Sequence, residues 1–181
     1  MRGNNLFYLG EFATAREHLE QSIALYDSRQ HHSHAFLYAQ DTKVVCLDRA
    51  SWVLCFLGYP DQALKLSHKA IVLAQELSHP HSFAHALSSA ATLHQYRREG
   101  QLAQEQAEAT ITLSTEQEFP LWWAWGTVLR GWVLGEQRQG QEGIAQIRQG
   151  ITAFQAKGAE VSQPYLLALL EIGRASCRER V

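Results

Sequence analysis

The stretch LGYPDQALKLSHKAIVL, residues 57–73, decides the fold. A glycine and a proline stand directly before a run whose apolar residues recur at helical spacing, namely Ala63, Leu66, Ala70 and Leu73. Proline is tolerated in the first turn of a helix, because its missing N–H would have no partner there. The pattern therefore predicts a helix over residues 60–76 with one apolar face.

A similar pattern, LGEFATAREHLEQSIAL, occupies residues 9–25. A tight turn between antiparallel helices needs the permissive backbone of glycine, and closely packed helices need small residues where their axes approach. The four glycines that punctuate the chain are spaced by 48, 42 and 40 residues: Gly10, Gly58, Gly100 and Gly140. Small residues follow five positions later at Ala15, Ala63 and Ala145, and twelve positions later at Ser22, Ala70, Thr112 and Thr152. Such self-similarity is typical of a solenoid.

Helical periodicity extends along the whole chain. Prolines stand at the starts of four of the predicted helices, at positions 60, 80, 120 and 164, and apolar–polar alternation typical of strands is nearly absent. We expect an all-α fold, an α-solenoid of about four antiparallel helix pairs. The predicted helices cover 3–9, 11–27, 41–57, 60–76, 80–98, 101–117, 120–138, 141–157 and 163–170.

The last eleven residues, EIGRASCRERV at 171–181, break this pattern abruptly. They resemble the translation of a sequencing adapter, so we assign 1–170 to the helical repeat domain and 171–181 to a non-native tail. The repeat pattern begins and stops inside incomplete helix pairs, which predicts a solenoid truncated at both ends. Solenoids cover their end faces with polar caps. We therefore expect an uncovered apolar face formed by Leu166, Leu167, Leu169 and Leu170.

Composition narrows the function classes. The chain has 181 residues, 46% of them hydrophobic and 19% charged, with a net charge of −2. That is enough apolar material for one core, and the charge favours neither nucleic acid nor an anionic membrane as a partner. The longest apolar run, residues 52–57, is too short to span a bilayer. The three cysteines form no CxxC motif, which favours a reducing, cytoplasmic location.

Motifs for catalysis are missing from the sequence. It contains no P-loop, GxGxxG, HExxH or GxSxG pattern, so we expect a non-enzymatic protein without a cofactor. His81 and His85 share a helical face, and three more histidines cluster at 31, 32 and 34. Neither group has a local cysteine or carboxylate to complete a zinc site, so we expect no metal.

The segments 9–25 and 57–73 resemble the second halves of tetratricopeptide repeats. The match is good at Gly10 and Gly58, fair at Gly140, and poor at Gly100, where Glu105 replaces the expected alanine. The spacing exceeds the family's usual period of about 34 residues. More specifically, stretches such as AQELSHPHSFAHAL and FPLWWAWGTVLRGW resemble the C-terminal helical region of large bacterial signalling proteins. Those proteins join an ATPase domain to a nucleotide-cyclase-like or DNA-binding domain.

This resemblance covers residues 3–170 and implies a regulatory tail without either catalytic domain. The expected function is protein–protein interaction, with a protein, a peptide or a neighbouring domain of the parent chain as partner. The alternative, from a different class, is a small-ligand sensor whose pocket is the tryptophan-rich region.

Five residues are candidates for partner binding. Within residues 119–132 the spacing puts Trp122, Trp125 and Trp132 on one face, as a packed core or a recognition patch, and Trp123 off it. The segment 28–40 is long for a plain connector and is either packed on the solenoid or in contact with a partner. Two adjacent arginines either bind an acidic peptide or complement a helix C-terminus. The candidates are Phe36, Tyr38, Arg97, Arg98 and Trp123.

Overall fold

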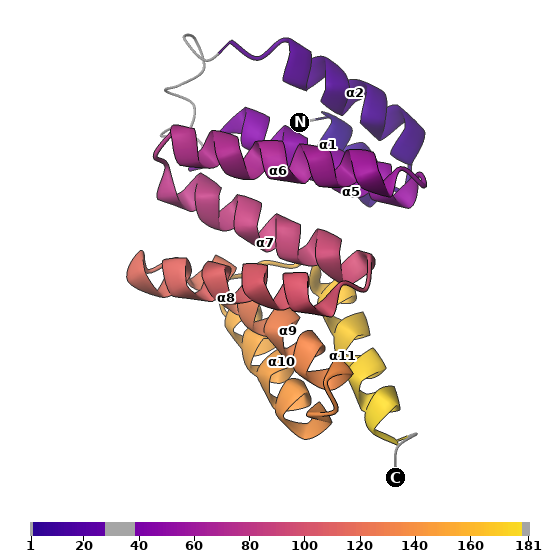
Figure 1. The fold of residues 1–181 in the computed structure, drawn as a ribbon, viewed down its shortest axis with the longest axis vertical. Helices are drawn as coiled ribbons and strands as arrows, with labels where there is room; N and C mark the ends of the chain where they lie inside the picture. The colour runs from indigo at the N-terminus through magenta and orange to yellow at the C-terminus, as the bar shows by residue number, and fades with distance from the viewer. Residues whose placement is uncertain (1, 28–38, 179–181) are drawn as a thin grey trace. The chain divides into compact units, whose positions relative to one another are not determined.

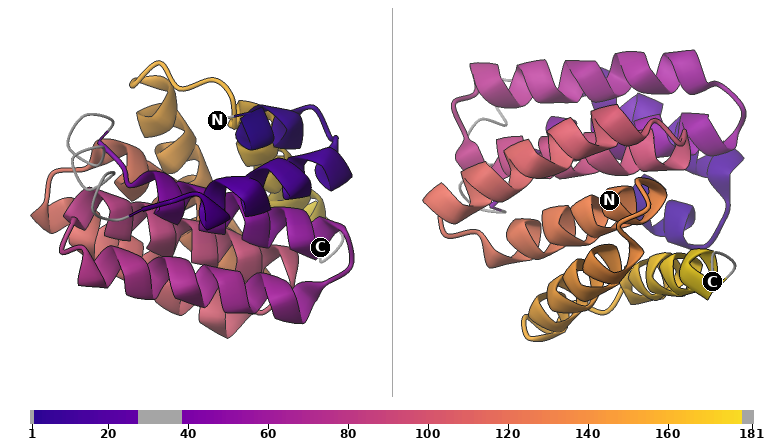
Figure 2. Two further views of the ribbon diagram at one scale, coloured as in Figure 1. Left: turned by 90° about the horizontal axis from the view of Figure 1, so that it is seen from above. Right: turned by 60° about the horizontal axis from the view of Figure 1, so that its bottom comes forward.

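The computed structural model describes residues 2–27 and 39–178, with side chains through residue 175. Every regular element in this part of the chain is a helix and none is a strand, which confirms the predicted all-α fold. The chain divides into two compact units, unit 1 at Met1–Arg97 and unit 2 at Arg98–Val181. Figure 2 shows from two sides how consecutive helices lie next to one another within each unit.

Unit 1 is built around α5, which packs against every other helix of the unit (Figure 1). Its core is apolar on both sides of α5: Ala15, Leu19, Cys46, Ala50 and Val53 form one cluster, and Val44, Leu47, Ala70, Ala74 and Ala86 form the other. The helices are α1 (Arg2–Tyr8), α2 (Phe12–Ala24), α5 (Thr42–Phe56), α6 (Pro60–Glu76) and α7 (Pro80–Tyr96).

Unit 2 is organised in the same way around α9, which packs against the other three helices of the unit. The helices are α8 (Gly100–Glu116), α9 (Pro120–Glu136), α10 (Gly140–Gln155) and α11 (Gln163–Arg178). The expected uncovered leucine face is wrong for three of its four members. Leu166, Leu169 and Leu170 are buried, because α11 packs against α9 and α10, and only Leu167 is exposed.

Three-residue turns join all consecutive helices except α2 to α5 and α10 to α11, and each of these turns contains one left-handed residue two positions before the next helix. Left-handed φ angles occur at intervals of 20 residues: 87° at Gly58, 50° at Ser78, 58° at Arg98, 55° at Glu118, 67° at Arg138 and 69° at Gly158. The placement of the turn at Gly100 and Gly140 therefore needs correction, because these glycines are the first residues of α8 and α10. A non-glycine residue can hold the left-handed conformation at a cost of about 1–2 kcal/mol.

The small-residue pattern shifts with the turn. Ala145, predicted as a packing residue, is exposed. Counted from the left-handed residue instead, the fifth position is buried and small in all four second helices: Ala15, Ala63, Ala103 and Gly143. The mismatch at Glu105 disappears, because the equivalent residue is Ala103.

Helix boundaries agree with the prediction to within a few residues except at the C-terminus. Pro60, Pro80 and Pro120 each begin a helix, as expected. The last helix continues through Arg178, where the pattern predicts an end at residue 170. No described helix has both the length and the apolar character needed to cross a membrane.

Candidate functional site

The structure describes three of the five residues predicted to bind a partner. Phe36 and Tyr38 lie outside the described residues. Arg97 caps the C-terminus of α7 and is half-buried, and Arg98 is exposed. Trp123 is half-buried in α9. It is therefore less accessible than its predicted position, off the helix face shared by Trp122, Trp125 and Trp132, led us to expect.

Two tryptophans of the aromatic-rich helix belong to the core of unit 2. Trp125 and Trp132 are each only 6% exposed. The ring of Trp125 stacks on Tyr165 at 5.8 Å and lies 5.8 Å from Phe154. The cavity that Trp132 lines has a volume of about 10 Å³, which is about the space one water molecule needs. The packed-core interpretation is confirmed for these two residues.

Unit 1 has a groove lined by residues of α2, α5 and α6. Its volume is about 460 Å³. Both α2 and α6 pack on α5. We call this site the α2–α6 groove. Its lining comprises Ile23 of α2, Lys43 and Leu47 of α5, and Leu66, His68, Lys69, Val72, Leu73 and Glu76 of α6.

The polar side chains of the α2–α6 groove are mostly basic. Two of the four lysines in the chain, Lys43 and Lys69, line it together with His68, and Glu76 is the one acidic lining residue. The helix start holds Lys43 in place: Asp41 accepts hydrogen bonds from the backbone N–H groups of Lys43 and Val44, and from the Tyr26 hydroxyl at 2.6 Å. The Lys43 ammonium lies 5.1 Å from the centre of the Tyr26 ring.

A second polar cluster is buried inside unit 1. Asp48 of α5 is 2% exposed and its carboxylate lies 3.8 Å from His85 Nδ1 of α7. Burial raises the pKa of Asp48 well above its usual range, although the Arg49 charge and the Ser89 hydroxyl act in the opposite direction. Burial, with help from the charges of Arg49 and His81, lowers the pKa of His85 to about 3. At neutral pH the imidazole of His85 is therefore neutral.

Arg49, also buried, lies against three aromatic rings. Its guanidinium lies 4.3 Å from the centre of the Trp52 ring, 4.9 Å from that of Phe7 and 5.1 Å from that of Tyr8. Such cation–π contacts gain strength when they are shielded from water. The arginine thus joins α1 to α5 in the core, which is a structural role.

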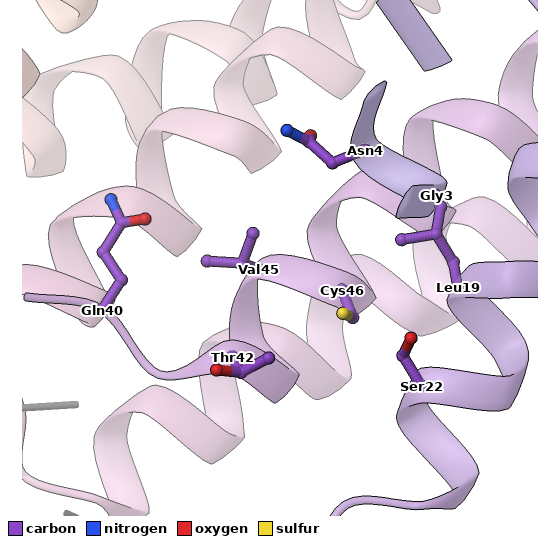
Figure 3. Close-up of a pocket in the computed structure, with 8 residues that line it drawn as sticks. All are labelled: Gly3, Asn4, Leu19, Ser22, Gln40, Thr42, Val45 and Cys46. Carbon is purple, nitrogen blue, oxygen red and sulfur yellow. The ribbon is translucent and has the colours of Figure 1, made fainter. Parts of the chain in front are cut away.

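A smaller pocket lies between α1, α2 and the start of α5 (Figure 3). Its volume is about 60 Å³, so it holds no more than a very small molecule. The Ser22 hydroxyl and the Cys46 thiol point toward one another in it (Figure 3). Burial raises the pKa of Cys46, which keeps the thiol protonated and a poor nucleophile.

Sequence reasoning missed both the groove and the buried cluster. The groove combines residues of three helices, so no local sequence motif predicts it. One signal was available: Lys43, Lys65 and Lys69 are three of only four lysines and all lie in one third of the chain. The buried cluster had a weaker sequence signal, the charged pair at 48–49 between apolar residues of the same predicted helix.

Within the described part of the chain, no three histidine, cysteine or acidic side chains are arranged so that they could hold a metal ion. His79 instead caps α7, where its Nδ1 accepts a hydrogen bond from the Ser82 N–H at 3.2 Å.

Comparison with protein-family models, curated proteins and solved structures gave no match. The resemblance to tetratricopeptide repeats therefore stays a prediction from the sequence.

Proposed function

We propose that this chain is a non-catalytic interaction module that binds a protein or peptide, or a neighbouring domain of a larger cytoplasmic bacterial signalling protein. The observation that carries the proposal is the α2–α6 groove, with its apolar floor and polar rim. An apolar centre surrounded by polar residues is the usual anatomy of a protein interface. The signalling context comes from the sequence resemblance alone.

The state of the buried reactive groups also favours a binding role. The Cys46 thiol is protonated and His85 is a neutral, buried imidazole. A catalytic base or nucleophile needs access to substrate and a pKa near the working pH. Neither residue combines these properties.

The alternative function, a small-ligand sensor in the tryptophan-rich region, has less support. Trp125 and Trp132 pack against other core side chains, and the cavity beside Trp132 is too small for a metabolite. Nothing in the described geometry of that region favours a ligand.

A peptide-display selection on the whole chain tests the proposal. Selected random peptides should bind with saturable, micromolar affinity. Val72→Arg places a long charged side chain in the groove, whereas Gln75→Arg adds the same side chain to an exposed position of α6 that does not line it. We expect the Val72 variant to weaken binding by about tenfold or more, and the Gln75 variant to change it little. If no peptide binds, the chain is not a peptide-binding module; if both variants bind like the wild type, the groove is not its site.

A further inference from the structure

We infer that the α2–α6 groove receives the apolar face of an acidic amphipathic helix from a protein partner. This inference rests on the proposed function and adds to it the shape and the charge of the partner. Three properties of the groove carry it: its length, its floor and its rim.

The length of the groove fits a helix. The lining positions of α6 run from Leu66 to Glu76, a distance of about 15 Å along the helix axis. They recur as Leu66, Lys69, Leu73 and Glu76, a spacing that follows one face of α6 over three turns. A site lined over three turns of α6 and bounded by side chains of α2 and α5 suits a docked amphipathic helix.

The floor of the groove is continuous with the core of unit 1. Leu47 is 3% exposed, and Ile23, Leu66 and Leu73 pack partly buried against the same core cluster. Apolar side chains of a partner would therefore extend an existing core rather than form a new one. The volume of about 460 Å³ has room for several such side chains.

The rim of the groove selects the charge of the partner. Lys43 of α5 and Lys69 of α6, which is exposed, both line the groove, so carboxylates beside the apolar face of a docked helix would meet ammonium groups. His68 adds a further donor, and Glu76 marks one end at which the partner should carry no acid. The chain's own segment 28–38 contains no aspartate or glutamate, so its sequence lacks the complementary charge.

A biased helix library tests the inference. The apolar positions of a roughly 18-residue peptide are fixed as leucine at i, i+4, i+7 and i+11, and the flanking positions are varied between glutamate and lysine. Selection on the wild-type chain should enrich glutamate. Selection on the Lys43→Glu/Lys69→Glu variant should enrich lysine instead. A matched control, Arg148→Glu/Lys157→Glu, changes the net charge equally at exposed sites in unit 2 and should still enrich glutamate.

The affinity of one selected peptide gives the quantitative result. It should fall by about tenfold or more for the Lys43/Lys69 variant and change little for the control. A central proline in the peptide should abolish binding, because it breaks the helix. Equal enrichment of glutamate and lysine, or glutamate enrichment that survives the groove variant, would overturn the inference. If random peptides bind through the groove while the helix library yields none, the interaction module stands and the acidic helix is wrong.

Discussion

At the scale of single residues, Asp48 and His85 show how burial sets protonation. Burial raises the pKa of Asp48 above its ordinary 3.8 and lowers that of His85 from 6.5 to about 3. The two shifts oppose each other as pH falls below 6.5. The unfolded chain then protonates His85 and the folded chain does not, which lowers stability. Asp48 acts in the opposite sense, because the folded chain holds its proton where the unfolded chain has lost it.

The variant Asp48→Asn separates these effects. Asparagine does not titrate, so the variant lacks the stabilisation that the folded wild type gains in acid by keeping Asp48 protonated. The neutral, buried His85 is unchanged. Between pH 7 and pH 4.5 the free energy of unfolding should therefore fall further in the variant than in the wild type. Urea denaturation at several pH values measures this difference. Other titrating groups are common to both proteins, so parallel pH profiles would mean that the pair does not titrate as described.

At the scale of helices, α9 and α10 pack backbone to backbone through glycines. A Cβ atom at Gly143 would lie 2.5 Å from the carbonyl oxygen of Gly131, and one at Gly150 would lie 2.6 Å from that of Ala124. Real Cβ atoms do not approach that closely, so any side chain at these positions would push the helices apart. The close approach of α9 and α10 therefore depends on small residues at these buried positions. Gly143 is the fifth residue after the left-handed turn residue Arg138.

The matched pair Gly143→Ala and Gly135→Ala tests this contact. The first should lower the free energy of unfolding by about 1–3 kcal/mol, because it overpacks the α9–α10 interface. The second places its methyl group in open space within α9 and should be neutral, or stabilising by about 0.5–1 kcal/mol. Denaturation followed by tryptophan fluorescence measures both. Equal effects in the two variants would contradict the backbone contact.

At the scale of the whole molecule, each unit has its own buried core around a central helix, α5 or α9. In unit 2 the contribution of α11 to the core comes from Leu166, Leu169 and Leu170. The following residues Glu171, Ile172 and Ala175 are exposed. Beyond Leu170, the described side chains of α11 lie at the surface or are half-buried, and none is fully buried.

Deletion of residues 171–181 should change the free energy of unfolding by less than about 1 kcal/mol, because the deleted side chains that are described lie mainly at the surface. Leu166→Ala is the sensitivity control. It removes a fully buried side chain and should cost about 2–5 kcal/mol. Thermal or chemical denaturation compares the two. A loss above about 2 kcal/mol on deletion would assign the terminal segment a structural role.

Sequence reasoning worked best where the signal is local. The helix predicted over residues 60–76 matches α6, because proline and the apolar stripe define both its start and its face. It failed at Gly100, because the left-handed turn residue is Arg98. An arginine at that position does not indicate a turn in the sequence. It also missed the α2–α6 groove, whose walls come from Ile23, Lys43 and Lys69 on three different helices.

The sequence by itself determined the helices and their repeat, and it predicted that the described residues form no strand. Apolar periodicity and proline act over a few neighbouring residues, so these features can be predicted locally. Only the tertiary structure decided which residues are buried, which turn residue is left-handed and where a groove opens. It placed Asp48 beside His85, covered Leu166 with neighbouring helices and brought Lys43 near Lys69. These outcomes depend on how helices distant in the chain pack, and packing depends on side-chain shapes from several elements at once.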